Sequence, residues 1–166
     1  MIKLRIALTP AENKEHQRLL AGYQGKAAFD SHFKHFVKKE TIIWDDLNVC
    51  YSGNLFQMDK CFISADTLHF VDVKKYQGNY CYHQSCWFKE TYNLFEQMNR
   101  ALSITKKMMN DFQVDIQLKD HIIFIDPDAQ IILQDEAPIH IVTFNQIQAW
   151  LTHLNNQLQP ACQPSL

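Results

Sequence analysis

The sequence predicts a mixed α/β (α+β) fold in which helices flank a central mixed β-sheet. Helical segments at the start, middle and end of the chain alternate with runs of short apolar strands, which is the order typical of such a fold. Hydrophobic residues make up 46% of the 166 residues and charged residues 20%, as in ordinary globular proteins. We expect a single domain over residues 1–159 and a C-terminal tail over 160–166.

The first helix is expected over residues 12–39, with an interruption near Gly22 and Gly25 because glycine weakens a helix. After Gly25, apolar side chains recur at helical spacing and form one stripe that faces a core: Phe29, Phe33, Phe36 and Val37.

A β-region follows, in which turn residues separate apolar runs. The expected strands cover residues 42–44, 47–51, 55–64, 67–74 and 80–88. The turns between them are Ser52-Gly53-Asn54, the two residues Ala65-Asp66, and the segment 76–80.

The second half of the chain is expected to alternate between helix and strand. A helix over 90–112 precedes a short, continuous apolar run at 121–125, which is typical of a strand covered on both faces. Further strands are expected at 130–133 and 138–142. Thr143 and Gln146 have the spacing of a capping box, so the last helix begins there and buries apolar residues from Ile147 to Leu158.

The hairpin around Ala65-Asp66 brings chemistry-bearing residues together. A two-residue turn pairs Ser64 with Thr67, and counting outward then pairs Asp59 with Asp72, with Cβ atoms about 5 Å apart. Lys74 lies two residues beyond Asp72 and therefore points to the same face of the sheet.

Two carboxylates that face each other repel unless a cation lies between them. A hard divalent metal such as Mg²⁺ suits them, because it binds one or two carboxylates together with water and phosphate oxygens. Lys74 would orient a nucleophile or neutralise developing charge. The alternative is a solvated salt bridge among Asp59, Asp72 and Lys74 on an edge hairpin.

Several short motifs, in order along the chain, resemble the nuclease-related domain family (NERD) of restriction-endonuclease-like PD-(D/E)xK nucleases. These motifs are Leu19–Gly25, Phe56–Asp59, Val71–Gly78, Asn93–Gln97 with Arg100, and Ile122–Pro127. The resemblance extends from about Leu19 to Ile147 and implies a restriction-endonuclease-like core.

The resemblance also implies a mechanism, which is the Mg²⁺- or Mn²⁺-dependent hydrolysis of DNA phosphodiester bonds. Asp59, Asp72 and the Val73 carbonyl would bind the metal, and Lys74 would assist the attacking water. Gln97, on the helix after the hairpin, would be an accessory catalytic group near the phosphate.

One departure from the family pattern bears on activity. The family usually has Glu directly after the glycine that matches Gly25, whereas this chain has Lys26, a cation in place of an anion. Asp30, one helical turn later, would either substitute for this Glu or, as the preferred interpretation, be a solvated residue on an amphipathic helix. Asp72 stands where the family more usually has Glu; it is a shorter side chain but also a carboxylate ligand. Lys26 therefore favours the alternative function, an inactive nuclease-fold module that binds nucleic acid or protein.

Charge and composition limit the partners. The formal net charge of −2 excludes binding of nucleic acid through bulk charge, so DNA contacts would need a local patch. The candidates for this patch are Lys26, Lys34, Lys75 and Arg100, with Lys38, Lys39, Lys106 and Lys107 as further basic residues. No apolar run approaches the roughly 20 residues that span a bilayer, so no membrane partner is expected.

Five cysteines, an odd number, predict reduced thiols, and the first residues lack a signal-peptide core, so the expected location is cytoplasmic. Cys81 and Cys86, with His83 between them, raise the alternative of a zinc site, but one pair supplies too few ligands. Buried thiols are the preferred interpretation. With only four glycines, the chain lacks a Gly-rich phosphate loop.

Overall fold

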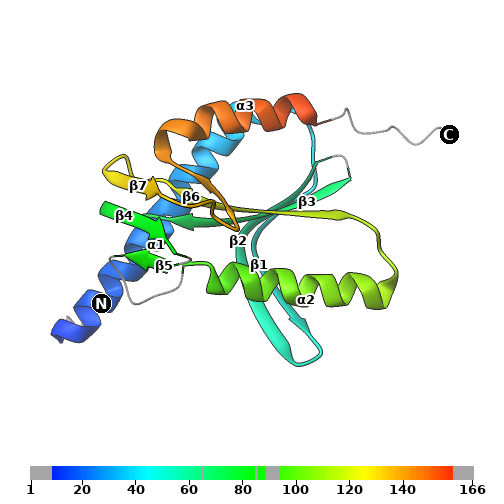
Figure 1. The fold of residues 1–166 in the computed structure, drawn as a ribbon, viewed down its shortest axis with the longest axis horizontal. Coiled ribbons are helices and arrows are strands. Elements are labelled where there is room, and N and C mark those ends of the chain that lie inside the picture. The colour runs from blue at the N-terminus through cyan, green and yellow to red at the C-terminus, as the bar shows by residue number, and fades with distance from the viewer. Residues whose placement is uncertain (1–8, 65, 85, 89–93, 159–166) are drawn as a thin grey trace, which may run out of the picture.

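The computed structural model describes residues 9–64, 66–84, 86–88 and 94–158, with 86–88 as backbone only. The expected tail over 160–166, Asn93 of the family-like motif, and Cys162 lie outside this part of the chain. The elements in chain order are α1 (Pro10–Phe36), β1 (Ile43–Tyr51), β2 (Asn54–Ser64), β3 (Thr67–Lys74), β4 (Gly78–His83), β5 (Cys86–Phe88), α2 (Glu96–Phe112), β6 (Gln117–Phe124), β7 (Ala129–Leu133), β8 (His140–Val142), the short helix η1 (Phe144–Gln146) and α3 (Ile147–Gln157) (Figure 1).

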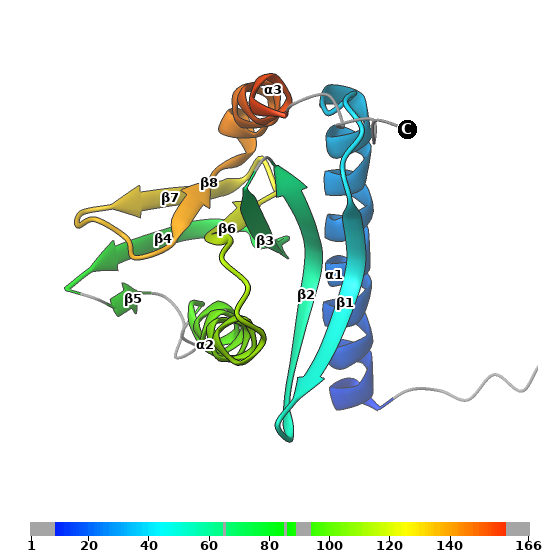
Figure 2. The same cartoon turned by 90° about the vertical axis from the view of Figure 1, so that its right-hand side faces the viewer.

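The central sheet has five strands in the order β1-β2-β3-β6-β8. The pairs β1–β2 and β2–β3 are antiparallel, whereas β3–β6 and β6–β8 are parallel. Helices α1 and α3 lie on one face of this sheet and α2 lies on the other (Figure 2). The predicted mixed central sheet with flanking helices is therefore confirmed.

A second, smaller sheet was not predicted. The region expected as one strand over 80–88 contains two strands, β4 and β5, which pair antiparallel through the turn after His83. Strand β7 adds to β4 in parallel and completes a three-stranded sheet.

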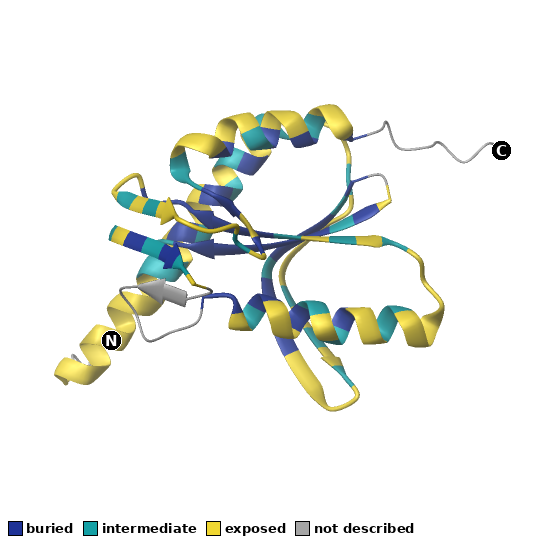
Figure 3. Cartoon of the chain, viewed as in Figure 1, coloured by how far each residue is buried: buried dark blue, intermediate teal, exposed yellow. Residues whose placement is uncertain are grey.

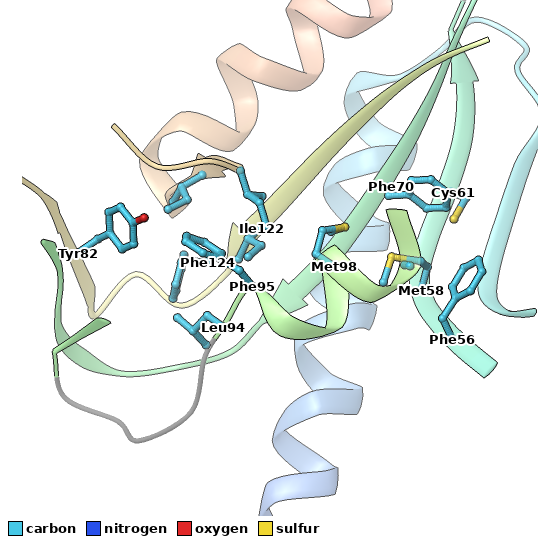
Figure 4. Close-up of a cluster of buried hydrophobic side chains, with 13 residues drawn as sticks. Phe56, Met58, Cys61, Phe70, Tyr82, Leu94, Phe95, Met98, Ile122 and Phe124 are labelled. Carbon is cyan, nitrogen blue, oxygen red and sulfur yellow. The ribbon is translucent and has the colours of Figure 1, made fainter. Parts of the chain in front are cut away.

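Two hydrophobic clusters pack against the two faces of the central sheet. On the α2 side, Met98 lies near Met58 of β2 and Ile122 of β6 (Figure 4). On the other side, Phe29 of α1 and Leu151 of α3 pack over the sheet. The buried residues concentrate in the sheet and the sides of the helices that face it, whereas the first turns of α1 are exposed (Figure 3).

The predicted interruption of the first helix is wrong, because α1 continues from Pro10 through Gly22 and Gly25 to Phe36. It begins at Thr9, which forms a capping box with Glu12 that the sequence analysis did not identify. Glycine costs a helix only about 1 kcal/mol, which packing along the rest of α1 offsets.

Gly25 has a packing role, because it lets α1 approach the end of β3. A Cβ atom at this position would lie 3.0 Å from the Cβ of Lys75 and 3.4 Å from Cγ2 of Ile125. The close approach of α1 to the sheet fixes the position of the next residue, Lys26.

The two strands expected at 42–44 and 47–51 form one strand, β1, with a local distortion at Asp46. Asp46 adopts a left-handed backbone conformation with φ of 48°. The ladder pairs Asp45 with Lys60 and Leu47 with Met58, and the residues between them, Asp46 and Asp59, leave the regular pairing.

The predicted hairpin register is confirmed. The β2–β3 ladder pairs Ser64 with Thr67 and continues to Lys60 and Val71. The strand predicted to be covered on both faces is also confirmed, since Ile122 and Ile123 are both buried and belong to opposite clusters. The predicted capping box of Thr143 and Gln146 is present.

Candidate active site

Asp59 lies where β2 separates from β3. The ladder between these strands ends one residue earlier, at Lys60 and Val71, so Asp59 is not a ladder partner of Asp72. Instead, its Oδ2 accepts a hydrogen bond of 2.8 Å from the backbone N–H of Val73. The carboxylate therefore reaches across the gap that opens between the two strands.

Asp72 and Lys74 lie two residues apart on β3 and project from the same face. Both are buried, Asp72 with only 2% of its surface exposed. Their side chains form an ion pair with 2.7 Å between Nζ and Oδ2, although this oxygen accepts no well-formed hydrogen bond among the described residues.

The electrostatics of this pair reflect its burial. Burial, with a contribution from nearby Asp59, raises the pKa of Asp72 to about 6, although Lys74 acts in the opposite direction. Burial acts to lower the pKa of Lys74, but the attraction of Asp72 outweighs the effect of burial. The pKa of Lys74 is therefore raised. Asp59 and Lys74 therefore both act on the charge of Asp72, in opposite directions.

Lys26 contributes a second ammonium to the site. Its Nζ lies 2.8 Å from Oδ1 of Asp59 and 2.5 Å from Oδ1 of Asp46. Partial burial acts to lower the pKa of Lys26, but the two carboxylates outweigh burial and raise it. A charged lysine thus stands at the place where a cation would contact Asp59.

Asp46 is the site residue that the sequence analysis missed. Its position was interpreted only as a break between two strands. A signal was nevertheless present, because the turn at Ser52-Gly53 pairs Tyr51 with Asn54, and counting outward places Asp46 opposite Asp59.

Other candidate residues lie elsewhere. Asp30 does not reach the site, because it pairs with the buried Lys60, which also contacts Asp45. Lys75 donates a hydrogen bond to the side chain of Gln24 on α1. Lys34 is exposed two helical turns beyond Lys26.

Gln97 and Arg100 lie on α2, on the same side of the sheet as Asp72. The amide of Gln97 donates a hydrogen bond of 3.0 Å to the carbonyl of Gln57, two residues before Asp59. Both side chains line a depression of about 340 Å³ between β2 and α2, and Arg100 also lines a second one of about 300 Å³ beside Tyr51.

The donor set suits a hard cation. Asp59 and Asp72 supply carboxylate oxygens, and Mg²⁺ commonly takes one or two of these with the remaining positions filled by water and phosphate. A cation would also offset the cost of placing charged Asp72, whose Oδ2 lacks a hydrogen bond, next to Asp59. In the described part of the chain, no group of three or more His, Cys, Asp or Glu side chains is arranged to hold a metal.

The alternative zinc site concerns Cys81 and Cys86, which lie on β4 and β5. Cys81 carries a free, half-buried thiol, and the side chain of Cys86 lies outside that part of the chain. The tyrosines beside it, Tyr80 and Tyr82, are buried in the packing of the molecule.

A five-stranded mixed sheet with flanking helices, carrying two acidic residues and a lysine where β2 and β3 separate, defines a restriction-endonuclease-like core. The chain matches the family model of the nuclease-related domain (NERD) over residues 21–125. This match covers more than half of the chain, so the protein belongs to the nuclease-related domain family, as its motifs predicted. No curated protein and no solved structure was found to match it. No helix among the residues described has the length and apolarity needed to cross a bilayer.

Proposed function

We propose that this domain hydrolyses phosphodiester bonds in DNA with the help of Mg²⁺ or Mn²⁺. The observation that carries the proposal is the burial of Asp72 and Lys74 as a charged pair directly beside Asp59. Burying charged groups lowers the free energy of unfolding. Buried charged groups of this kind are therefore found preferentially at active sites, where they have a chemical role. A purely structural salt bridge would gain little from burial.

Each residue of the site has a role in this proposal. Asp59, Asp72 and the carbonyl of Val73 would hold the metal, which supplies a Lewis acid that stabilises charge on a phosphate oxygen and promotes ionisation of water. The ammonium of Lys74, fixed by Asp72 at 2.7 Å, orients the attacking water and neutralises charge that develops on the phosphate. Gln97 lies near the scissile phosphate as an accessory group.

The DNA would pass between β2 and α2. Arg100 lines both depressions on this side, and guanidinium groups bind phosphate well. Lys75 lies at the end of β3 and, with Lys26, provides further positive charge near the site. Lys34 lies on α1, which covers the opposite face of the sheet from α2, so we do not assign it to this contact surface. The proposal includes a cytoplasmic location.

Plasmid cleavage tests this proposal. Purified wild-type protein and the variant Asp72→Asn would be incubated with supercoiled DNA and Mg²⁺ or Mn²⁺. We expect the variant to lose at least about 100-fold in rate, because it removes a metal ligand and the partner of Lys74. The control is Asp111→Asn, which makes the same change at an exposed carboxylate on α2 that pairs with Lys107.

Two outcomes would refute hydrolysis by this site. Cleavage that persists in Asp72→Asn would come from a contaminating nuclease. No cleavage by the wild-type protein at saturating metal would leave the second candidate function, a nuclease-fold module that binds DNA without cutting it. The contact of Lys26 with Asp59 favours that candidate, because an ammonium already compensates this carboxylate. DNA binding that is equal with EDTA and with Mn²⁺ would support it.

A further inference from the structure

We propose that Lys26 is a tethered counter-ion that competes with divalent metal for the site, and that Asp46 is an additional metal ligand exposed when Lys26 moves away. This inference rests on the proposed function, because it concerns the regulation of the same site. It predicts a domain that binds metal weakly until its own lysine is displaced.

The geometry defines one position for a cation. Oδ1 of Asp46 and Oδ1 of Asp59 both contact the same atom, Nζ of Lys26, at 2.5 and 2.8 Å. Two carboxylate oxygens on neighbouring strands therefore converge on a single point that a positive charge already occupies. A divalent cation at this point would have oxygen ligands of the kind it prefers.

The backbone of β1 keeps Asp46 in this arrangement. Its φ of 48° is a left-handed conformation that costs a non-glycine residue free energy, and it interrupts the ladder between β1 and β2. This backbone conformation places the carboxylate of Asp46 beside Asp59. The neighbouring Asp45 stays in the ladder and pairs with a different lysine, Lys60.

An independent observation concerns the carboxylate on the inner side of the site. Oδ2 of Asp72 is buried and accepts no hydrogen bond among the described residues, and Lys74 is its only ion-pair partner there. Lys26 contacts the outer carboxylates, Asp46 and Asp59, whereas the ion-pair partner of Asp72 is Lys74.

The two lysines differ in their ability to leave. The side chain of Lys26 is 29% exposed, whereas that of Lys74 is only 10% exposed. Lys26 has a flexible four-carbon stem and can turn toward solvent while α1 stays in place. Lys74 is held within the sheet, so Lys26 is the ammonium that a metal would displace.

Binding of Mn²⁺, measured by titration calorimetry without DNA, tests the inference. The variants are Lys26→Met, Lys26→Gln, Lys26→Arg, and Lys26→Met combined with Asp46→Asn. We expect Lys26→Met and Lys26→Gln to bind Mn²⁺ at least about tenfold more tightly than wild type, as follows if the lysine occupies the site about nine-tenths of the time. Lys26→Arg keeps the charge and should bind as weakly as wild type.

The double variant should lose at least about tenfold of the gain, because one ligand is removed. The matched controls are Lys14→Met, which removes an exposed lysine of the same helix, and Lys26→Met with Asp45→Asn, which removes the neighbouring carboxylate. Neither control should change Mn²⁺ affinity relative to its parent. Circular dichroism would verify that each variant is folded, and Lys26→Gln serves if Lys26→Met does not fold.

Equal Mn²⁺ affinity in wild type and in the folded Lys26 variants would overturn the inference. Equal losses from Asp45→Asn and Asp46→Asn would overturn the role of Asp46. These results are distinct from failure of the proposed function, which is absence of cleavage that depends on Asp72. Tighter Mn²⁺ binding without cleavage would refute hydrolysis and leave the counter-ion role intact.

Discussion

The two glycines of α1 offer a matched test of how closely this helix must approach the sheet. At Gly22, an added Cβ would meet nothing within 4 Å, so Gly22→Ala changes only the helix propensity. At Gly25, the added Cβ would lie 3.0 Å from the Cβ of Lys75, which is closer than an ordinary van der Waals contact. The comparison of the two variants separates propensity from packing.

The magnitudes follow from these contacts. Alanine is favoured over glycine within a helix by about 1 kcal/mol, so Gly22→Ala should raise the free energy of unfolding by 0.5 to about 1 kcal/mol. Gly25→Ala gains the same propensity but forces α1 away from β3, which costs about 1–3 kcal/mol. We therefore expect Gly25→Ala to be less stable than Gly22→Ala by about 1–3 kcal/mol.

Thermal and urea denaturation would measure both variants. A difference of 1 kcal/mol corresponds to roughly 2–4 °C in Tm for a protein of this size. Because Lys26 follows Gly25 directly, the same displacement should also weaken the effect of Lys26 on Mn²⁺ binding. Equal stabilisation by Gly22→Ala and Gly25→Ala would refute the close packing of α1 against Lys75.

Two further changes test other parts of the structure. Burial lowers the pKa of His69 to about 4 and that of His121 well below its usual value, so both are neutral when folded. The stability that these two histidines contribute should thus be full above pH 6.5, the usual pKa in the unfolded chain, and should be lost as pH falls below it. The raised pKa of Asp72, about 6, acts in the opposite direction, but it is one group against two. We therefore expect a net loss of roughly 2 kcal/mol between pH 7 and pH 5 in urea denaturation, and a flat profile would contradict this. Lys60→Met should change the free energy of unfolding by less than about 2 kcal/mol, because its partners Asp30 and Asp45 are 35% and 55% exposed and stay hydrated. A larger loss in the same assay would show that the ion pairs of Lys60 are strongly stabilising.

The arrangement of the strands was predictable from the sequence because local features determine it. A two-residue turn at residues 65 and 66 sets the register of β2 and β3, and this register brings the regions of Asp59 and Asp72 together. The apolar run from Ile122 also identified a strand that is buried on both faces. A strand with one exposed face alternates between apolar and polar residues, whereas this run is continuously apolar.

The missed features depend on long-range packing. Gly25 weakens a helix locally, but α1 continues because the glycine allows contact with Lys75, about 50 residues later in the chain. Asp59 was expected opposite Asp72 in a regular ladder, but the strands separate there and its carboxylate binds the N–H of Val73 instead. The second sheet, which joins β4 to β7, likewise depends on residues far apart in sequence.

The hairpin register suggested a metal site from the residues alone, but only the family resemblance favoured it over a solvated salt bridge. An aspartate pair followed by a lysine is common on exposed hairpins, and nothing local to Asp72 predicts that it is buried. The register of the β1–β2 turn places Asp46 opposite Asp59, but its left-handed backbone conformation is a consequence of tertiary structure. Local propensity treats Asp46 as a turn residue.

Anomalous diffraction from crystals soaked in Mn²⁺ would show whether Asp59 and Asp72 hold a metal together. We expect one Mn²⁺ peak within about 2.5 Å of carboxylate oxygens of both residues, with the ammonium of Lys26 moved away from Asp59. A structure at saturating Mn²⁺ with no peak there, and with Lys26 still in contact with Asp59, would contradict this expectation.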